Sequence, residues 1–246
     1  MRIFTKILSI IFVIVFIFCV SISIILGVSS STFAKDEDAR RNIYFSSAYK
    51  LANNKTISIT ATTPYSLGEE GQYTKETATC VTNKDDQTTN CSMISRLYNA
   101  DASLVRTSYF PGDGYKYTNI NGEAKGTKTP YSNDNLQSYC ASFILGVNMY
   151  LALLSSDTRS IEESKLDFDS NIKFDFNTFS LFKNITIKYE ISNTKQIIGL
   201  KFDKNDFLRK VEIKASTDTE ELTTSINIDY KKANLDFSSL VGYTEA

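Results

Sequence analysis

The sequence predicts an α+β fold, in which a strongly curved antiparallel β-sheet of about ten strands forms a half-barrel around two helices. Two observations lead to this prediction. Most of the chain alternates polar and apolar residues with a period of two, which is typical of strands in a sheet with one wet face. One long segment, 134–154, instead repeats apolar residues every three or four positions, as an α-helix does. We therefore expect an N-terminal helix and a central apolar helix, the latter packed on the concave face of the sheet.

The first residues of the chain differ from the rest. An almost unbroken, uncharged apolar run, Ile7–Val28, follows two basic residues. As a helix rising ~1.5 Å per residue, this run could cross a hydrocarbon core of roughly 30 Å. The basic start, apolar centre and small residues before Lys35 equally match a secretory signal peptide. A cleaved signal at 1–34 and a retained membrane anchor both place residues 35–246 outside the cytoplasmic membrane.

We expect residues 35–246 to form a single extracytoplasmic β-rich domain, because 212 residues suffice for one large core. The whole chain has a net charge of −1, and residues 1–34 carry two positive charges, so the exported part carries −3. This small negative charge argues against a nucleic acid partner, which would require a strongly basic face.

The exported part starts with a predicted amphipathic helix over 36–52. Its first residues are acidic, and apolar residues follow at helical spacing. Strand alternation then appears at 56–61, 73–82, 88–97, 102–110 and 115–120. Asn121-Gly122 follows the last of these segments and predicts a two-residue hairpin into a strand at 123–129, because both residues tolerate positive φ.

Three cysteines lie in the exported part. Cys80 and Cys91 flank a segment whose centre is a polar turn, so a hairpin there would place them opposite each other on adjacent antiparallel strands. In an oxidising compartment we predict a disulfide bond between them. Cys140 is then left unpaired, either as a buried thiol or as a partner in an intermolecular bond.

The central helix is predicted to start at Asp134 as its N-cap. Its apolar residues recur at helical spacing: Leu136, Cys140, Phe143, Val147, Tyr150 and Leu154. Further apolar residues occupy most of the remaining circumference, and helices of that kind are covered on more than one side. We therefore expect other parts of the chain to pack around this helix.

Strand alternation returns after residue 164, with polar residues between the apolar ones. The apolar positions are Leu166, Phe168, Phe174, Phe176, Ile185, Ile187, Tyr189, Ile191, Leu200, Phe202, Val211, Ile213, Ile226, Ile228 and Tyr230. Among these segments, Asp203-Lys204-Asn205-Asp206 resembles the start of a calcium loop but lacks the glycine at position six and the closing glutamate. We predict a turn there and no metal site.

The composition argues against most catalytic machinery. The chain contains no histidine, which excludes Ser-His-Asp and Cys-His arrangements and histidine-containing metal sites. It also has no P-loop or dinucleotide-binding glycine pattern, so no cofactor is expected. A glycosidase needs only two carboxylates, but the acidic residues here fall on the polar positions of strands. We predict that the protein is not an enzyme, with a carboxylate-based enzyme as a minor alternative.

Two segments resemble a known group of proteins. They are Tyr109–Tyr117, followed by Asn121-Gly122-Glu123, and Leu200–Lys214. In these and in its order of elements, the chain is similar to the LolA-like lipoprotein carriers and the mycobacterial LppX/LprG-like lipoproteins of bacterial envelopes. The resemblance implies a strongly curved antiparallel sheet around helices, with an apolar cavity that holds acyl chains.

The aromatic content agrees with such a cavity and also with an ordinary core. The chain has 14 Tyr and 16 Phe but no Trp, and these rings could line an apolar site or fill the space between sheet and helix. If a cavity exists, its wall is the central helix, with Phe143, Val147, Tyr150 and Leu154 facing inward. The leading hypothesis is therefore a non-catalytic lipid-binding protein at the outer face of the membrane. The alternative is a structural or interaction module with a solid core that contacts another envelope protein.

Overall fold

A computed structural model describes residues 37–65, 69–83, 88–155, 172–176, 182–191, 194–216, 221–240 and 242–245. The N-terminal segment predicted as signal or anchor lies outside these residues, as do the strand predicted at 166–168 and the turn at 84–87. Where the structure describes the chain, no helix has the combination of length and apolar character needed to span a membrane.

The described elements are two α-helices, a short 3₁₀ helix and a sheet. They are α2 (Glu37–Asn53), β1 (Thr56–Pro64), β2 (Tyr73–Thr82), β3 (Thr89–Tyr98), β4 (Leu104–Phe110), β5 (Tyr115–Ile120), β6 (Thr127–Pro130), α3 (Asn133–Ala152), η1 (Leu153–Ser155), β7 (Ile172–Phe176), β8 (Phe182–Ile191), β9 (Thr194–Asp203), β10 (Leu208–Ser216), β11 (Glu221–Asp229) and β12 (Thr244–Glu245).

The strands form one open, curved sheet in the order β12-β6-β5-β4-β3-β2-β1-β11-β10-β9-β8-β7. Every described pair is antiparallel except β12 with β6, which is parallel, so the sheet is mixed and slightly larger than predicted. The first and last long strands, β1 and β11, pair in the middle and join an N-terminal half to a C-terminal half. The prediction of an α+β fold with a curved, mainly antiparallel sheet is confirmed.

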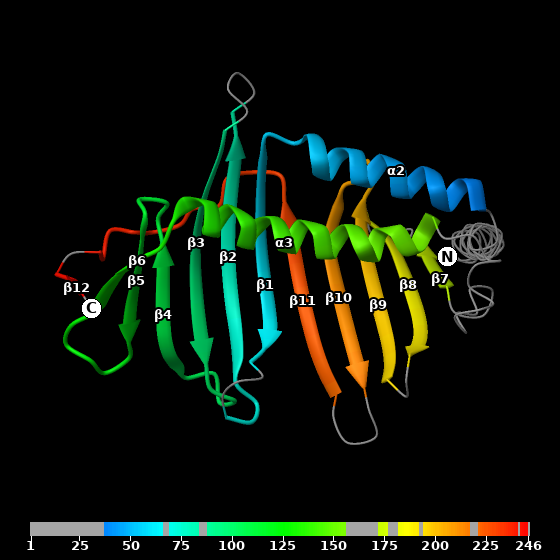
Figure 1. Cartoon of the computed structure of the whole chain (residues 1–246). Helices are drawn as coiled ribbons and strands as arrows, with labels where there is room; N and C mark the ends of the chain where they lie inside the picture. Colours follow the sequence, from blue (N-terminus) through cyan, green and yellow to red (C-terminus); the bar gives the residue numbers. More distant parts are fainter. Residues whose placement is uncertain are drawn as a thin grey trace, which may run out of the picture.

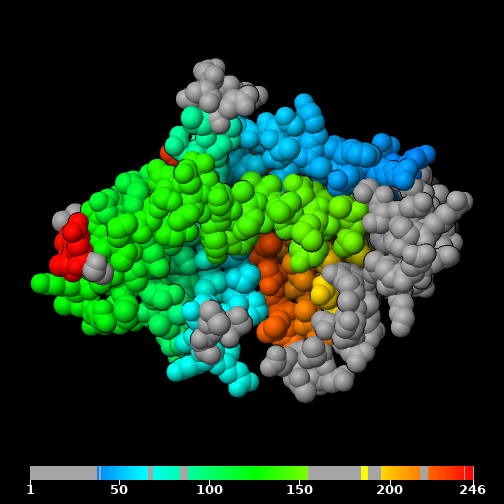
Figure 2. Space-filling model, viewed as in Figure 1, coloured from blue at the N-terminus to red at the C-terminus, as the bar shows by residue number. Residues whose placement is uncertain are grey.

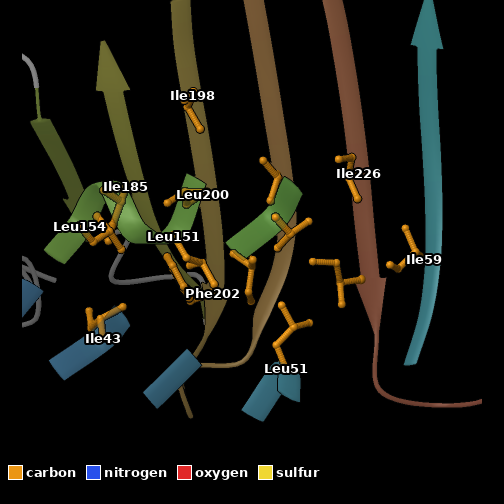
Figure 3. Close-up of a cluster of buried hydrophobic side chains, with 14 of the residues drawn as sticks. Ile43, Leu51, Ile59, Leu151, Leu154, Ile185, Ile198, Leu200, Phe202 and Ile226 are labelled. Carbon is orange, nitrogen blue, oxygen red and sulfur yellow. The ribbon is translucent and has the colours of Figure 1, made fainter. Parts of the chain in front are cut away.

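Both helices contribute to the core on one face of the sheet, called here the inner face. Figure 1 shows α3 crossing the strands and α2 running along their upper ends. The main core cluster combines Ile43 and Leu51 of α2, Val147 and Leu151 of α3, and Leu154 of η1 with inward-facing residues of β1 and β8–β11 (Figure 3). A second cluster packs Leu136 and Cys140 of α3 on β2, β3 and β4. Each fully buried aliphatic side chain contributes about 1.5–3 kcal/mol.

The N-terminus of α3 differs from the prediction by two residues. Ser132 is the N-cap, and its Oγ accepts a hydrogen bond from the Asn135 backbone N at 3.2 Å. Asp134 lies instead in the first turn, where its negative charge favours the positive end of the helix dipole. Serine and aspartate are about equally good N-caps, so their spacing in the sequence does not select between them.

The hairpin predicted at Asn121-Gly122 is present, because β5 and β6 pair antiparallel, but the prediction of a two-residue loop is wrong. A turn is present, since Gly122 has φ +89° and the Glu123 N donates to the Ile120 carbonyl at 3.1 Å. However, β6 starts only at Thr127, which pairs with Thr118. The intervening residues are held by the C-terminal strand, because the Thr244 N donates to the Gly126 carbonyl at 3.2 Å.

The outer face of the sheet is partly covered by the segment after β11. The backbone N of Ala233 donates to Ser58 Oγ and Thr79 Oγ1, both at 2.9 Å, which explains why these two hydroxyl side chains are buried. Farther along, Phe237 packs edge-on against Tyr109, with ring centroids 6.5 Å apart. The C-terminal segment therefore adds a second, smaller layer on the β1–β6 half.

Cys80 and Cys91 are directly opposed in the β2–β3 register and form a disulfide bond, with 4.1 Å between their Cα atoms. Cys140 is a free, buried thiol on α3, and its Sγ lies within 4.8 Å of the two bonded sulfurs. Burial, assisted by the charge of Glu76, raises the pKa of the Cys140 thiol to about 11. Of the two alternatives for Cys140, the structure places it as a buried thiol.

We predict that Cys140 resists alkylation in the native protein. With its pKa raised to about 11, the thiolate at pH 8 is on the order of a hundredfold scarcer than in an unfolded chain, where the cysteine pKa is about 8.5. Iodoacetamide should label Cys140 only after unfolding in urea, as measured by non-reducing peptide mapping, which separates it from Cys19. Rapid labelling of the native protein would contradict this burial.

Candidate ligand-binding face

The inner face of the sheet has one apolar half and a second half, called here the polar half, in which polar residues lie beside the apolar residues of the second cluster. The strand registers align nine residues in a row across it: Ile185, Leu200, Val211, Ile226, Ala61, Glu76, Ser95, Ser108 and Thr118. The row is apolar on β8, β9, β10, β11 and β1, and it is polar on β2, β3, β4 and β5. The change occurs where Ala61 of β1 pairs with Glu76 of β2. An elongated ligand along this face would therefore meet two different environments.

The apolar half extends beyond the part that α3 covers. Val211 and Ile226 are 0% and 6% exposed under the helix, whereas Ile213 is partly exposed and Leu222 is 48% exposed farther along the same strands. Figure 2 shows the molecule hollowed at this place, with the orange strands visible below α3. The described residues thus leave apolar sheet surface open next to the helix.

The four residues predicted to line a cavity separate into two pairs. Val147 and Leu154 are fully buried in the main core cluster. Phe143 and Tyr150 are partly buried and pack against the edge of that cluster. Burial raises the pKa of Tyr150, so its hydroxyl stays protonated at neutral pH. Within the described structure, Phe143 and Tyr150 are the members of the set that keep part of their surface exposed.

The opposite side of α3 is more exposed than the sequence predicts. Leu145 and Met149 are 64% and 65% exposed, so the described part of the chain covers this helix on one side and leaves the other open. Their i, i+4 spacing places the two side chains next to each other on the helix surface. The apolar composition of the helix correctly indicated a buried face, but it could not indicate which apolar residues remain at the surface.

Tyr139 connects the apolar and polar halves, and it was not among the residues predicted from the sequence. Its ring packs edge-on against Phe143, with centroids 5.3 Å apart. Its hydroxyl donates to Glu76 Oε2 at 2.7 Å, while Ser95 Oγ donates to Glu76 Oε1 at 2.9 Å. Burial and then the hydrogen bond to Glu76 raise the pKa of Tyr139 well above its usual range, so it remains a donor. The i, i+4 aromatic spacing of residues 139 and 143 was the available signal.

A pocket of about 450 Å³ occupies the polar half of the inner face beside α3. Its charged lining residues are Glu76, Arg106 and Lys116, and Met93 together with serine, threonine and aromatic side chains completes the wall. The Lys116 ammonium lies 5.8 Å from the centre of the Phe110 ring. Burial and the neighbouring Arg106 guanidinium lower the pKa of Lys116. Two cations therefore face the same pocket.

A second pocket, of about 670 Å³, lies on the outer face and has a structural explanation. Arg209 bridges its two carboxylates, at 2.8 Å to Asp203 and 3.3 Å to Asp229. Burial raises the pKa of Asp203, but hydrogen bonds from Arg209 and the backbone outweigh it and hold the pKa below its usual value. These contacts shape the predicted turn at Asp203–Asp206, whose Asp206 carbonyl accepts a hydrogen bond from Ser47 of α2 at 2.8 Å. Both carboxylates are engaged in holding the turn.

No protein-family model matches the chain, and neither does any curated protein sequence. Among solved structures, LprF from Mycobacterium bovis matches with a TM-score of 0.39 and 8% identity, covering 80% of this chain and 94% of LprF. An outer membrane lipoprotein-sorting protein domain from Vibrio parahaemolyticus matches with a TM-score of 0.23 and 8% identity, covering 81% and 96% of the two chains. A DUF1329 family protein from Desulfovibrio piger has a TM-score of 0.25 and 9% identity, with coverages of 81% and 98%.

The structural neighbours of this chain thus include an LppX/LprG-like protein and a lipoprotein-sorting domain. These are the groups that the two sequence segments resemble. At 8–9% identity and TM-scores below 0.5, the likeness says nothing about ligand or activity. Function must be argued from the residues of the inner face.

Truncations on the two sides of α3 should destabilise the protein to very different extents. Leu151→Ala should lower the free energy of unfolding by about 2–5 kcal/mol, because it leaves a cavity at a fully buried position. Met149→Ala, two residues earlier and largely exposed, should change it by less than about 0.5 kcal/mol. Urea unfolding followed by circular dichroism measures both values. Equal costs for the two variants would contradict this orientation of the helix.

Proposed function

We propose that this protein is a non-catalytic extracytoplasmic binding protein that holds a lipid or other apolar ligand between the curved sheet and α3. The observation that carries the proposal is the apolar inner face that continues past the helix to Ile213 and Leu222, the latter 48% exposed. An apolar ligand would remove this surface from water. The proposal takes α3 to pack on the concave face of the sheet.

The four predicted wall residues have two roles in this proposal. Phe143 and Tyr150, at the edge of the core, contact the ligand directly. Val147 and Leu154, fully buried, hold the helix at a fixed height above the strands. Such a wall is rigid where it meets the sheet and accessible along one side, which suits a ligand that enters laterally.

Burial of hydrocarbon is sufficient to drive such binding without a covalent step. Each buried methylene contributes about 0.8 kcal/mol, so ten of them contribute roughly 8 kcal/mol. Part of this gain offsets the translational and conformational freedom that protein and ligand lose on association. A single acyl chain would therefore bind reversibly, which is the behaviour required of a carrier. The N-terminal segment, as an anchor or a cleaved signal, would place residues 35–246 at the membrane's outer face.

A second function is favoured by the exposed apolar residues of the two helices. Leu145 and Met149 on α3 are more than 60% exposed, and so are Phe45 and Tyr49 on α2. Each pair has i, i+4 spacing and thus forms a small apolar surface. In the alternative, these surfaces contact another envelope protein, and the protein is an interaction module that needs no small ligand.

We predict that lipid copurifies with the chain when it is exported to a bacterial periplasm with its own N-terminal segment. Leu222→Glu places a charge on the open apolar surface and should remove most of that lipid. Thr223→Glu, the next residue of β11 and also exposed, points to the outer face and should leave the lipid content unchanged. Mass spectrometry of solvent extracts measures lipid per protein.

Because both variants share the N-terminal segment, any lipid bound there is the same in each. Circular dichroism checks that both fold. Equal lipid contents in the wild type and both variants would leave the interaction module as the better explanation.

A further inference from the structure

The pocket on the polar half of the inner face has an unusual charge arrangement. Arg106 of β4 and Lys116 of β5 line the same volume of about 450 Å³. Within the described chain neither cation forms an ion pair with a carboxylate. Glu76, the acidic residue in the pocket, is instead bound by Tyr139 at 2.7 Å and Ser95 at 2.9 Å. The repulsion between the two cations, which helps to lower the pKa of Lys116, is thus not relieved by a direct ion pair, although Glu76 lies in the same pocket.

This pocket adjoins the apolar core beside which the proposed function places its ligand. On the sheet, Glu76 at the pocket pairs directly with Ala61, which belongs to the main core cluster and pairs in turn with Ile226. On the helix, Tyr139 at the pocket packs against Phe143 at the edge of the same cluster. The polar pocket and the apolar half are therefore neighbours on the same face of the sheet.

We infer that this pocket binds the anionic group, a phosphate or a carboxylate, of an amphiphile whose apolar part lies along the open surface near Ile213 and Leu222. The inference rests on the proposed function and specifies its ligand class. A guanidinium binds two oxygens of such a group at once, and a nearby ammonium adds a second charge-assisted hydrogen bond. Partial exclusion of water in the pocket strengthens both interactions. An anion between Arg106 and Lys116 would also relieve their mutual repulsion.

The test compares two ligands that differ only in the head group: a long-chain fatty acid and the fatty alcohol of the same chain length. The full chain is kept soluble in a non-ionic amphipathic polymer, and dissociation constants are measured by calorimetry at a pH where the acid is ionised. Inorganic phosphate alone is the third probe. The variants are Arg106→Gln and Lys116→Gln.

Matched control variants come from the outer face of the same half of the sheet. Lys75 and Arg96 pair across β2 and β3, and alternation along the strands directs them away from the pocket. Lys75→Gln and Arg96→Gln therefore remove the same charges from the chain without changing the inner face. Their effects measure the contribution of net charge alone.

We expect the wild type to bind the acid at least roughly tenfold more tightly than the alcohol, as one charge-assisted hydrogen bond provides. Arg106→Gln and Lys116→Gln should each lose most of this preference for the acid. Their affinity for the alcohol should stay unchanged, which would show that the apolar site is intact. The two outer-face variants should retain the preference.

Three results would overturn the inference. Equal binding of acid and alcohol by the wild type, or a preference that survives both inner-face variants, removes the head-group site while leaving the proposed function in place. If free phosphate binds, if Arg106→Gln weakens that binding, and if the fatty acid binds no more tightly than phosphate, the pocket is a site for a soluble anion. Failure to bind either amphiphile removes the proposed function together with the inference.

Discussion

The pairing of β1 with β11 is the contact on which the rest of this structure depends. Ser58 and Asp229 are partners in this pair, although most of residues 35–246 lies between them in the sequence. A contact of such long range costs considerable chain entropy, which the apolar residues on both strands offset by burial. Ile59, Ala61, Ile226 and Ile228 all face the main core cluster. Without this pair the chain would have two small sheets, each with an apolar edge strand exposed to water.

The same pair decides the chemical character of the inner face. The C-terminal strands direct isoleucine, leucine and valine inward, whereas the N-terminal strands direct serine, threonine and charged residues to the same face beside the apolar residues of the second cluster. Joining the two halves through β1 and β11 produces a face that changes from apolar to polar at one strand boundary. Such a surface suits an amphiphile better than a purely apolar molecule, and it follows from strand order rather than from any single residue.

Helix α3 fits this divided face with two different parts of its length. Its C-terminal part inserts Val147 and Leu151 into the main cluster, and its N-terminal part places Leu136 and Cys140 over the disulfide-linked strands. Tyr139 and Phe143 lie between the two and contact each other. The disulfide bond fixes β2 to β3 under the first part of the helix, and it thereby supports the wall of the polar pocket. The helix is thus both a core element and the boundary of the candidate site.

Local sequence determined the elements of this protein, and the tertiary structure decided how they meet. The alternation over Tyr73–Thr82 predicted β2 with its observed bounds, and the spacing around the polar turn predicted the Cys80–Cys91 bond. Both depend on neighbours in the chain, and the period of a pattern shows which face a residue joins. It does not show which strands lie side by side. Arg106 and Lys116 meet Tyr139 in one pocket only because strand order and helix placement bring three distant segments together. For the same reason, the sequence selected the helix that lines the candidate site but not which of its apolar residues remain accessible.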